Sequence, residues 1–565
     1  MVRNCLFLFT SQAVKIMSVI ETSKIIELSE CNLETKTLLT GTLLKWMDVI
    51  ACLSAEKQAN VPCVTASVDD LQLMKSISLG QVLLLKAWIN RSFNTSMEVE
   101  VSVKTEDTTT MEQKHICQAF FTFVTQPDEN GKKQLVKPVL PESKKEKTQF
   151  RLANERKKMR LEYRASLKRL DESFDDGGFS FDEDVFEDAE SVDAATTACT
   201  CVEIVLPQHA NHHQTTFGGQ LMAWMESAGT ISARRMCHSL PRLVAVDEVF
   251  FRAPSKVGDR IVIKSSVNNT FDKSMEVGVR VEAYAVGGET RHIQSAYFTF
   301  IAPDGTGNPM QLPKIAASSK KHLQRMMRAE ERVRLRTERR SILRSVEPLA
   351  SVPLNEHNQK ILSYKNILAL MELYNSPGFK LKVQTDEIRL YQCKLEGRLC
   401  IRIECEIDVP PATVYKVLSD HKKRTIWDMA VTKVSIARII REDEDCVLHY
   451  AMQNLSPREN VKGDDFVVLA STRKDIRELH TIAYRSVTVA DLPPLPEYNR
   501  AQTRCSGFVL EAVNNTITTN GCKIIYLNQV TDHVYQYIKN DLEGATHTLA
   551  KRAIAIKELV KQSVP

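Results

Sequence analysis

Several patterns that mark specialised classes of protein are missing from this sequence. No uninterrupted apolar stretch approaches the ~20 residues that a membrane-spanning helix requires. The short apolar run at residues 5–9 follows Arg3, but no cleavage site of small residues comes after it, so we expect no signal peptide. Met17 is a second candidate for the start of the protein. A formal net charge of +5 over 565 residues does not indicate a nucleic-acid binder, and the sequence predicts a soluble protein.

The 14 cysteines lack the spacing of a disulfide framework or a zinc site. No CxxC pair occurs, and Cys199-x-Cys201, the closest spacing, supplies too few ligands for a metal. Reduced thiols in a cytosolic protein are the simplest interpretation. The common catalytic motifs are also absent: there is no GxSxG elbow, no GxxxxGK[ST] phosphate loop and no HExxH helix.

What the sequence does contain is a copy of itself. Residues 41–103 recur as residues 219–281 at a constant offset of 178 positions, and 12 of the 36 positions in residues 68–103 are identical in the second copy. A period this long indicates a duplicated domain, because solenoid repeats recur every ~20 to 50 residues. The offset pairs Gly41 with Gly219 and Asp48 with Glu226, so the two copies differ at a few polar positions.

Each copy predicts the same order of elements. Residues 41–53 and 219–232 carry almost no charge, which is typical of a helix buried on all sides. Residues 97–104 and 275–283 alternate between apolar and polar, which predicts antiparallel strands with one wet face. A last strand follows in each copy. A long buried helix wrapped by an antiparallel sheet, an α+β arrangement, is therefore expected twice.

Charged segments follow both copies. Residues 153–169 and 329–344 predict basic helices. Residues 171–193 contain 11 Asp or Glu and no Lys or Arg, which predicts a flexible linker, with an electrostatic tether to the basic helix as the alternative.

A third domain begins near residue 350, where the repeat stops. Residues 399–409 alternate strictly and predict a strand, and Pro410-Pro411 precedes a short predicted helix. Apolar residues at three-and-four spacing over 542–560 predict a long amphipathic helix.

Two features could carry chemistry. Asp48 is a carboxylate on a helix built for burial, and burying a charge is costly unless it is hydrogen-bonded or neutralised. A partly exposed helix face, or a carboxylate satisfied by backbone, is the structural alternative. The run His209-Ala210-Asn211-His212-His213 precedes Gly218-Gly219, and glycines at a helix start let backbone N–H groups approach a ligand. The histidines fit either a pocket-lining loop or a metal site that lacks other ligands.

The run from His209 through Phe217-Gly218-Gly219 to Trp224-Met225-Glu226 resembles the acyl-coenzyme A thioesterase family with tandem hotdog domains. Leu43 to Asp48 and Val64 to Asp69 carry the same resemblance in the first copy. In the third domain, Arg424-x-x-Trp427-Asp428, Asp465-Phe466-Val467 and Tyr498-Asn499-Arg500 resemble a START lipid-binding domain with its helix-grip fold.

The resemblance implies composite sites, each with a loop from one copy and a helical carboxylate from the other. Asn211 faces Asp48 in one site, whereas the offset of 178 places Leu33 against Glu226 in the other, so we predict one working site per chain. Asn32 adjoins Leu33, and a shift of one residue would restore an amide there.

The implied reaction is hydrolysis of a thioester. Asp48 acts as a general base on water or as a nucleophile that forms a mixed anhydride. Asn211 orients the water or the thioester, and backbone N–H groups at Gly218 and Gly219 stabilise the oxyanion. No metal or organic cofactor is required. Some relatives respond to adenine nucleotides, but this sequence has no phosphate loop to locate such a site.

The family's coenzyme A contacts map onto four segments of this sequence. They are Ala66, Ser67 and Val68; Thr95, Ser96 and Met97; Lys158; and Phe251, Arg252 and Ala253. Without the resemblance, Lys158 would belong to a solvated charged face. Gln214 stands where relatives usually have glycine.

We therefore expect four segments. They are a hotdog domain at 18–148, a basic helix with acidic linker at 149–195, a second hotdog domain at 196–345 and a START domain at 350–563. The resemblance to cytosolic acetyl-CoA hydrolases favours acetyl-CoA as substrate, a fatty acid or other lipid in the START domain, and a trimer of tandem hotdogs or a multiple of it. Medium- or long-chain acyl-CoA is the alternative substrate. A lipid carrier or sensor with decayed hotdog domains is the rival function.

Overall fold

The computed structural model describes residues 19–562, with gaps. The gaps are residues 70, 74, 108–109, 129, 177–190, 212–213, 248, 286, 305–306, 345–352, 357, 396–397, 454–461, 475–478, 515–519 and 530–541. Residues 5–9, Met17, His212 and His213 thus lie outside the described part of the chain. Two compact units comprise residues 1–333 and residues 334–565.

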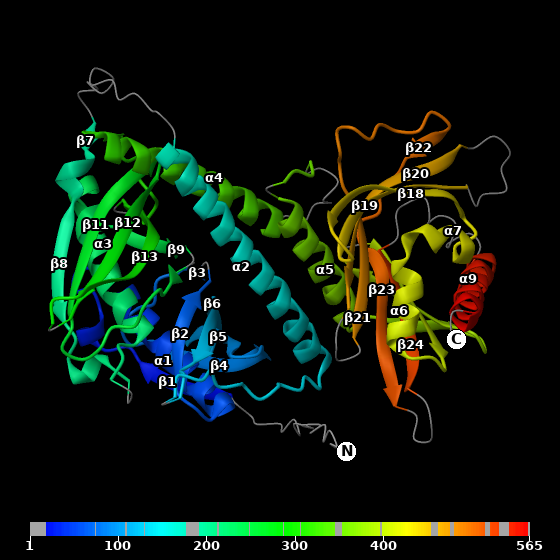
Figure 1. Ribbon diagram of the computed structural model, residues 1–565, viewed down its shortest axis with the longest axis horizontal. Helices are drawn as coiled ribbons and strands as arrows, with labels where there is room; N and C mark the ends of the chain where they lie inside the picture. The colour runs from blue at the N-terminus through cyan, green and yellow to red at the C-terminus, as the bar shows by residue number, and fades with distance from the viewer. Residues whose placement is uncertain are drawn as a thin grey trace, which may run out of the picture. The chain divides into compact units, whose positions relative to one another are not determined.

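The first copy of the repeat forms an antiparallel sheet around one long helix (Figure 1). Its elements are β1 (Ile20–Ile25), α1 (Thr40–Ala59), β2 (Cys63–Val68), β3 (Leu71–Gln72), β4 (Val82–Ser92), β5 (Ser96–Glu106) and β6 (Gln113–Thr125). The strands run in the order β1-β4-β5-β6-β2-β10, so the sixth strand comes from the second copy. The helix α2 (Lys144–Asp176) follows.

The second copy repeats this arrangement. Its elements are β7 (Val192–Asp193), β8 (Cys199–Ile204), α3 (Gly218–Cys237), β9 (Arg242–Val246), β10 (Val249–Phe250), β11 (Arg260–Phe271), β12 (Ser274–Tyr284), β13 (Thr290–Ile301), β14 (Ile315–Ala316) and α4 (Lys320–Arg344). The sheet runs in the order β3-β9-β13-β12-β11-β8, and β7 pairs with β14 apart from it. The hotdog fold predicted from the sequence is confirmed.

Each sheet is completed by a short strand from the other copy. In the first sheet Val249 of β10 pairs with Val68 of β2, and in the second Leu71 of β3 pairs with Val246 of β9. The buried side chains of both copies form a single hydrophobic cluster. Because β10 pairs with β2, the segment after β10, which begins with Phe251, lies against the first copy.

Both central helices are longer than the sequence predicted. They extend to Ala59 and Cys237 rather than to residues 53 and 232, because amphipathic turns continue beyond the uncharged stretch. Each ends at a left-handed residue, Asn60 with φ 55° and His238 with φ 51°, and these two are themselves 178 positions apart.

Small residues let α1 and α3 pack closely against each other. A Cβ atom on Gly41 would lie 3.0 Å from the Cα of Ala223. A Cβ atom on Gly219 would lie 2.7 Å from the Cβ of Asp48 and 2.8 Å from the Cα of Lys45. The pairing of Gly41 with Gly219 in the sequence thus marks two points where the helices approach each other closely.

The prediction of a wet outer sheet face is wrong at Glu98 and Glu100 of the first copy, whereas Lys104 on the same face of β5 is exposed. Glu98 has no exposed surface and Glu100 is 4% exposed, because α2 covers them. Arg156 of α2 forms an ion pair of 2.6 Å with Glu98, and Arg160 bridges Glu98 at 3.2 Å and Asp69 at 2.8 Å. Burial raises the pKa of Glu98, but the arginines outweigh it and hold the pKa below its ordinary value.

The second copy has the same construction. Glu276 has no exposed surface, and Arg332 of α4 pairs with it at 2.5 Å. Arg332 also lies over the ring of Tyr297, as Arg156 lies over Phe120. The basic helices α2 and α4 therefore pack on the outer faces of the sheets through these ion pairs.

Both basic helices begin earlier than predicted. The N–H of Glu146 donates to the hydroxyl of Ser143 while the carboxylate of Glu146 accepts from the N–H of Ser143, a capping box that starts α2. The expected acidic linker is also shorter at both ends. Residues 171–176 belong to α2, residues 177–190 lie outside the described chain, and Val192–Asp193 form β7.

The C-terminal unit is an antiparallel sheet with helices. Its elements are α5 (Gln359–Asn375), β15 (Lys380–Gln384), β16 (Arg389–Leu395), β17 (Arg398–Ile407), α6 (Pro411–Ser419), α7 (Arg424–Trp427), β18 (Val431–Arg441), β19 (Asp445–Met452), β20 (Gly463–Arg473), β21 (His480–Ser486), β22 (Tyr498–Arg500), β23 (Ser506–Asn514), β24 (Asn520–Gln529) and α9 (Leu542–Gln562). The main path is β15-β16-β17-β24-β23-β21-β20-β19-β18. The strand, the short helix and the final helix predicted for this region are confirmed.

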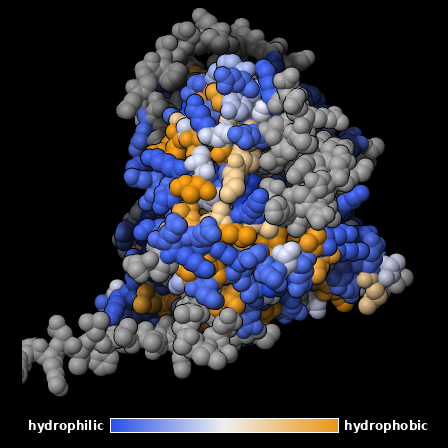
Figure 2. Space-filling model, turned by 90° about the vertical axis from the view of Figure 1, so that its right-hand side faces the viewer, coloured by the Kyte–Doolittle hydropathy of each residue, from blue (hydrophilic) through white to orange (hydrophobic). Residues whose placement is uncertain are grey.

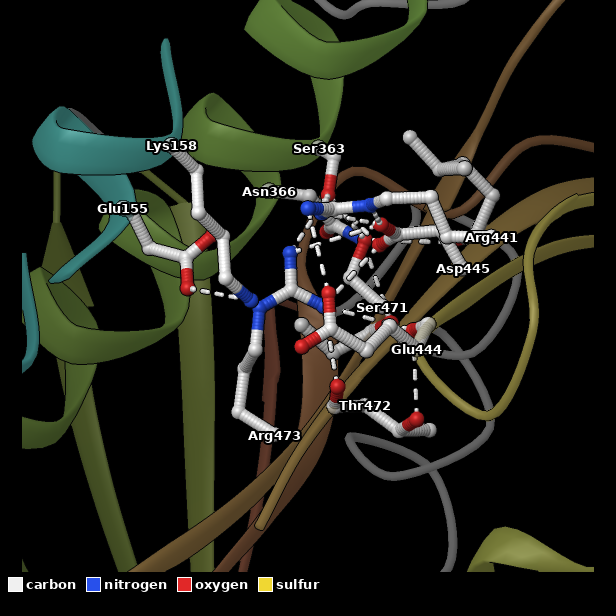
Figure 3. Close-up of polar contacts among 12 residues, drawn as sticks. Glu155, Lys158, Ser363, Asn366, Arg441, Glu444, Asp445, Ser471, Thr472 and Arg473 are labelled. Carbon is white, nitrogen blue, oxygen red and sulfur yellow. Dashed lines mark hydrogen bonds and ion pairs between the residues drawn. The ribbon is translucent and has the colours of Figure 1, made fainter. Parts of the chain in front are cut away.

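A buried polar cluster fastens α5 to this sheet (Figure 3). The hydroxyl of Ser363 donates to Asp445 at 2.5 Å and accepts from Arg473 at 2.8 Å. Burial raises the pKa of Asp445, but Arg473 and Arg441 outweigh it and lower the pKa. Asn366 adds hydrogen bonds to the backbone of β20 and β21.

Within the described chain, no helix has the length and hydropathy needed to cross a bilayer. On the face drawn in Figure 2, hydrophobic side chains lie in small groups among hydrophilic ones. Large exposed apolar side chains of the C-terminal unit include Ile426, Met429 and Ile439.

The packing of α1 on α3 predicts that Gly219→Ala is strongly destabilising. The new methyl group would meet the backbone of Lys45 and Leu44, which cannot yield, and we expect a loss of about 3 kcal/mol in the free energy of unfolding. Gly287→Ala, whose methyl group would meet no atom within 4 Å, is the control. Thermal unfolding of both variants would be compared with the wild type. Equal melting temperatures for the two would contradict the close helix contact.

Candidate functional site

Asp48 lies on α1 with no exposed surface. Its Oδ2 accepts a hydrogen bond of 2.8 Å from the backbone N–H of Gly219, and its Oδ1 accepts one of 2.8 Å from the hydroxyl of Thr65. Burial raises the pKa of Asp48 to about 6, while these two hydrogen bonds partly oppose the rise. The carboxyl thus titrates near neutral pH, which suits a group that exchanges a proton during catalysis.

Asn211 opens the loop between the 3-10 helix η4 (Pro207–His209) and α3. Its side-chain Oδ1 accepts from the N–H of Thr215 at 3.1 Å and from the hydroxyl of Thr215 at 3.0 Å. Because these bonds engage Oδ1, the Nδ2 group is the donor side of the amide. Gln214 has φ 61°, a left-handed conformation that favours glycine. The glutamine therefore adopts the backbone shape expected of the glycine it replaces.

A pocket of about 480 Å³ brings the two copies together at this point. Thr65 and Cys52 line it from the first copy, and Asn211 and Gly218 line it from the second. Asp48 stands directly behind this wall, since it is hydrogen-bonded to Thr65 and to the residue after Gly218. The amide and the acid predicted to cooperate are thus at one cross-copy pocket, with Thr65 between the carboxylate and the cavity.

Gly218 and Gly219, both predicted as oxyanion donors, have different surroundings. The N–H of Gly219 is engaged by Asp48, so its predicted oxyanion role is corrected to one of holding the carboxylate. Gly218 lines the pocket, and its N–H has no acceptor within the described part of the chain. A Cβ atom on Gly218 would lie 2.9 Å from the ring of Phe251 and 3.0 Å from the Cβ of Thr65, so only glycine fits without displacement.

Four of the predicted coenzyme A contacts line the pocket. They are Ala66, Phe251, Arg252 and Ala253. The N–H of Phe251 donates to the carbonyl of Ala66 at 3.1 Å, which extends the pairing of β10 with β2. The exchange of short strands therefore builds this wall of the site.

The other predicted contacts do not line the pocket. They are Ser67 and Val68 within β2, Thr95, Ser96 and Met97 around the turn from β4 to β5, and Lys158 on α2. Met97 has no exposed surface. The carbonyl of Thr95 accepts from the N–H of Thr125, which does line the pocket. Lys158 is half-buried, and its Nζ lies 3.7 Å from Glu155.

His209, the first histidine of the run, does not line the pocket. The ring of His209 accepts from the N–H of Leu206 at 3.2 Å and packs edge-on against Trp224. His212 and His213 lie outside the described residues. Among the residues that the structure describes, no group of three His, Cys, Asp or Glu side chains could hold a metal ion.

The pairing of Asn211 with Leu33 is wrong. The two loops are closed by equivalent isolated bridges, Cys31 with Leu38 and Ala210 with Thr216. The first-copy loop therefore holds one residue more, and the residue after its first bridge position is Asn32. Leu33 is 67% exposed. Asn32 is thus the structural counterpart of Asn211, the shift of one residue considered above.

The second composite site is nevertheless less complete than the first. Its acid, Glu226, accepts a hydrogen bond of 3.0 Å from Thr230 in its own helix, and burial raises its pKa to about 7. The offset of 178 positions places Leu243 where the first site has the Thr65 hydroxyl, and Thr40 where it has Gly218. We therefore still predict one fully equipped site per chain. The two sites differ in the donors at the positions of Thr65 and Gly218 and not in the amide.

Thr65 is the site residue that the sequence reasoning did not identify. The signal was present, since the offset pairs Thr65 with Leu243 in the second copy. Asp48 had been singled out differently, as a charge on a helix built for burial.

Comparison with known proteins gives matches over both parts of the chain. The profile of the thioesterase superfamily matches residues 36–112 and 213–285, and that of the START domain matches residues 362–542. Acyl-coenzyme A thioesterase 11 of Mus musculus is 41% identical over 89% of this chain and 84% of that protein. Acetyl-coenzyme A thioesterase of Rattus norvegicus is 35% identical over 93% of this chain and 94% of that protein. A solved acyl-CoA hydrolase from Staphylococcus aureus, in complex with butyryl coenzyme A, is 29% identical over 26% of this chain and 92% of that chain, with a TM-score of 0.26.

Because the carboxyl of Asp48 is buried, we predict that Asp48→Asn is more stable than the wild type and that this difference grows as pH rises. The folded pKa of about 6 lies above the ordinary value of 3.8, so the stability contributed by the protonated form is present below pH 3.8 and lost as pH rises through 6. Asparagine can keep the bond from Gly219 without a charge. We expect its advantage over the wild type to grow by about 1 kcal/mol between pH 5 and pH 8.

Urea unfolding at the two pH values measures this advantage. Asp386→Asn, at an exposed position, is the control. A difference between wild type and Asp48→Asn that stays constant with pH would show that Asp48 is not held as a raised-pKa carboxyl.

Proposed function

The chain belongs to the acyl-coenzyme A thioesterases, and we propose that its composite pocket hydrolyses short-chain acyl-CoA with acetyl-CoA as the preferred substrate. The observation that carries the proposal is the buried Asp48 behind Thr65, with Asn211 across the same pocket. The relatives from rat and mouse that bear the name acetyl-coenzyme A thioesterase support the choice of acyl group.

Asp48 acts as a general base rather than as a direct nucleophile. Both of its oxygens are hydrogen-bonded and the residue has no exposed surface, which leaves no path for a thioester carbon to reach it. A water molecule in the pocket can instead donate to the hydroxyl of Thr65, whose own proton is directed at Asp48. As the water attacks, one proton passes to Thr65 and the proton of Thr65 passes to Asp48.

The thioester carbonyl lies between the Nδ2 of Asn211 and the N–H of Gly218. Charge develops on that oxygen as the tetrahedral intermediate forms, and preorganised donors in a partly enclosed pocket stabilise it. When the intermediate collapses, the C–S bond breaks and the proton held by Asp48 returns to the thiolate. The products are the carboxylic acid and coenzyme A with a free thiol, and no metal or organic cofactor takes part.

Coenzyme A binds along the wall formed by the exchanged strand. Phe251 and Ala253 offer apolar contact near the reacting thioester, and Arg252 offers a cation to a phosphate group. Lys158 and the β4–β5 turn at Thr95 and Ser96 serve the more distant part of the ligand. Ser67, Val68 and Met97 contribute through their backbone, because their side chains are in the core.

The proposed relay predicts distinct effects for three substitutions. Asp48→Asn should lower kcat for acetyl-CoA by roughly 10²- to 10⁴-fold. Thr65→Ala should lower kcat and raise the apparent pKa of the rising limb above about 6, since the hydroxyl lowers the pKa of Asp48. Thr65→Ser should restore both. Asn211→Ala should lower kcat by roughly 10²-fold, with little shift of the profile.

Thiol release from acetyl-, medium- and long-chain acyl-CoA across pH 5 to 9 measures these effects. Activity that persists in both Asp48→Asn and Asn211→Ala would refute the site, and no wild-type activity with any chain length would favour the lipid-carrier function. A maximum with long chains would remove acetyl-CoA as the preferred substrate.

For the START domain, we propose a ligand with an acidic head group. Arg424 is buried, and its Nε and Nη1 have no hydrogen-bond partner in the described chain. Its closest carboxylate, Asp428, is 3.9 Å away and is bound by Arg552 of α9 at 2.7 Å. The hydroxyl of Tyr484 and the indole N–H of Trp427 are also unpartnered, so acceptors are missing from an interior rich in donors.

A fatty acid would supply such an acceptor. We expect a fluorescent C16 fatty acid to bind more tightly than the corresponding alcohol, and Arg424→Gln to abolish that preference. Arg389→Gln, which changes an exposed arginine of the same unit, should leave it intact. Equal affinity of the wild type for acid and alcohol would exclude an acidic head group.

We also propose a cytosolic homo-oligomer, a trimer of tandem hotdogs or a multiple of it. The edge strand β8 exposes Val202 and Ile204 at 60% and 54%, and β1 exposes Ile25 at 61%. Apolar side chains on unpaired edges favour assembly. The 13 described cysteines are free thiols, as the cytosol would keep them. A stable monomer in light scattering at micromolar concentration would contradict the assembly.

A further inference from the structure

The pocket beside Asp48 has an exposed part and a buried part. Arg252 is exposed where it lines the pocket, whereas Cys52, Cys63 and Leu221, which also line it, are 5%, 0% and 3% exposed. We call these three residues the closed end of the pocket. The charged phosphate groups of a coenzyme A ester stay at the exposed part, because burying an unpaired charge is costly. The acyl group is the part of the substrate that the closed end can receive.

The closed end exists because α1 extends past the start of α3. The two helices are antiparallel, since the start of α1 at Gly41 packs on Ala223 and the start of α3 at Gly219 packs on Lys45. Cys52 comes almost two helical turns after Lys45 and so lies beyond the start of α3. It faces the loop that precedes α3, which lines the same pocket.

Cys52 lies one helical turn after Asp48, on the same face of α1. Its Sγ lies 4.0 Å from the carbonyl oxygen of Cys63 at the start of β2, which is the weak donor contact of a thiol. One turn further along α1, the carboxylate of Glu56 accepts from the N–H of Cys63 at 3.2 Å. Cys63 also pairs with Thr125 of β6. The helix and the two strands therefore meet around Cys52 and close the pocket there.

The thiols of the closed end behave as small apolar groups. Burial, and then the carboxylate of Asp48, raise the pKa of the Cys52 thiol, so this thiol stays protonated near neutral pH. Burial also raises the pKa of the Cys63 thiol. Because a protonated thiol is only a weak hydrogen-bonding group, the closed end favours a hydrocarbon chain over a polar one.

The second composite site differs at this surface. The offset of 178 positions pairs Cys52 with Thr230 and Cys63 with Pro241. The hydroxyl of Thr230 donates to Glu226 at 3.0 Å, so a polar group engaged by the acid replaces the thiol. An apolar closed end beside the acid therefore belongs to the fully equipped site.

The distance from the proposed relay to the closed end is short. Two strand positions of about 3.3 Å each separate Thr65 from Cys63. Four helical positions with a rise of about 1.5 Å each separate Asp48 from Cys52. Both routes give about 6 Å, and part of this length is taken up by the contact between the chain end and the thiol. With carbon–carbon bonds of about 1.5 Å, roughly two to four carbon atoms fit.

We propose that Cys52 is a specificity-determining residue, which contacts the end of the acyl chain and limits it to roughly two to four carbon atoms. The proposal rests on the hydrolysis of acyl-CoA proposed for this pocket, and it adds the residue that sets the chain length. The side chain at position 52 decides how many methylene groups enter, whereas Asp48 and Thr65 decide whether the thioester reacts.

Calorimetric titration of the full chain with S-alkyl-CoA thioethers tests the proposal. These probes carry the chain without the carbonyl group that is hydrolysed, so binding is measured apart from turnover. For the wild type, we expect the affinity to stop rising at or before S-butyl-CoA and to be lower for S-hexyl- and S-octyl-CoA. Coenzyme A without a chain is the reference for each variant.

Two substitutions change the size of the side chain in opposite directions. Cys52→Ala makes room for one more methylene group and should raise the affinity for S-butyl-CoA relative to S-ethyl-CoA about fourfold. Cys52→Leu fills the closed end and should lower the same ratio roughly tenfold. Both should bind coenzyme A itself as the wild type does. Cys117→Ala and Cys117→Leu, at a buried cysteine of β6 that does not line the pocket, are the matched controls and should keep the wild-type ratio.

The outcomes separate this proposal from the proposed function. A ratio that stays unchanged in both Cys52 variants overturns the proposal, as does an equal change in the Cys117 variants or a wild-type affinity that keeps rising through S-octyl-CoA. Acetyl-CoA hydrolysis can persist in each of those cases. Conversely, a ratio that follows the size of residue 52 supports the proposal even if acetyl-CoA is not hydrolysed. Thermal unfolding checks each variant, and Cys52→Ala, which removes a single atom, carries the test if Cys52→Leu does not fold.

Discussion

The hydrogen bond from the backbone of Gly219 to Asp48 joins the two copies at the functional site. It exists because α1 and α3 approach so closely that no side chain fits at Gly219. The same contact supplies a donor to a carboxylate that has lost all contact with water. Helix packing and the placement of Asp48, the proposed catalytic acid, are therefore one constraint. Substitutions that loosen the helices would be expected to alter the chemistry even at a distance from the substrate.

Keeping Asp48 ionised in this place reduces stability. A pKa raised from 3.8 to about 6 corresponds to about 3 kcal/mol at neutral pH, which is the cost that remains after the bonds from Gly219 and Thr65 have offset part of the burial. The large shared core supplies the compensation. The acids on the outer sheet faces are buried differently, because Glu98 and Glu276 each form an ion pair with an arginine that neutralises the charge. Asp48, in contrast, is buried with two neutral donors, the N–H of Gly219 and the hydroxyl of Thr65.

Much of this arrangement is readable from the sequence, and the exceptions have physical causes. The duplication, the two central helices and the period-two strands follow from spacing alone, and Asp48 stood out as a charge in a buried helix. The wet sheet face failed because alternation shows which residues face outward but not whether a later helix covers them, as α2 covers Glu98 and Glu100. The pairing of Leu33 failed because a constant offset cannot detect an extra loop residue, which appears only in backbone bridges. Thr65 was hidden by its ordinary place in a strand.

The exchange of β3 and β10 has a consequence for the history of the chain. Since each sheet takes its last strand from the other copy, cutting the gene between the repeats would leave both halves with a missing edge. The halves are thus inherited as a pair, while selection on each can differ. The second composite site has Leu243 of the second copy in place of Thr65 and Thr40 of the first copy in place of Gly218, so the two sites differ although the two copies stay together. Structural interdependence of this kind keeps both copies in the chain while the two composite sites diverge.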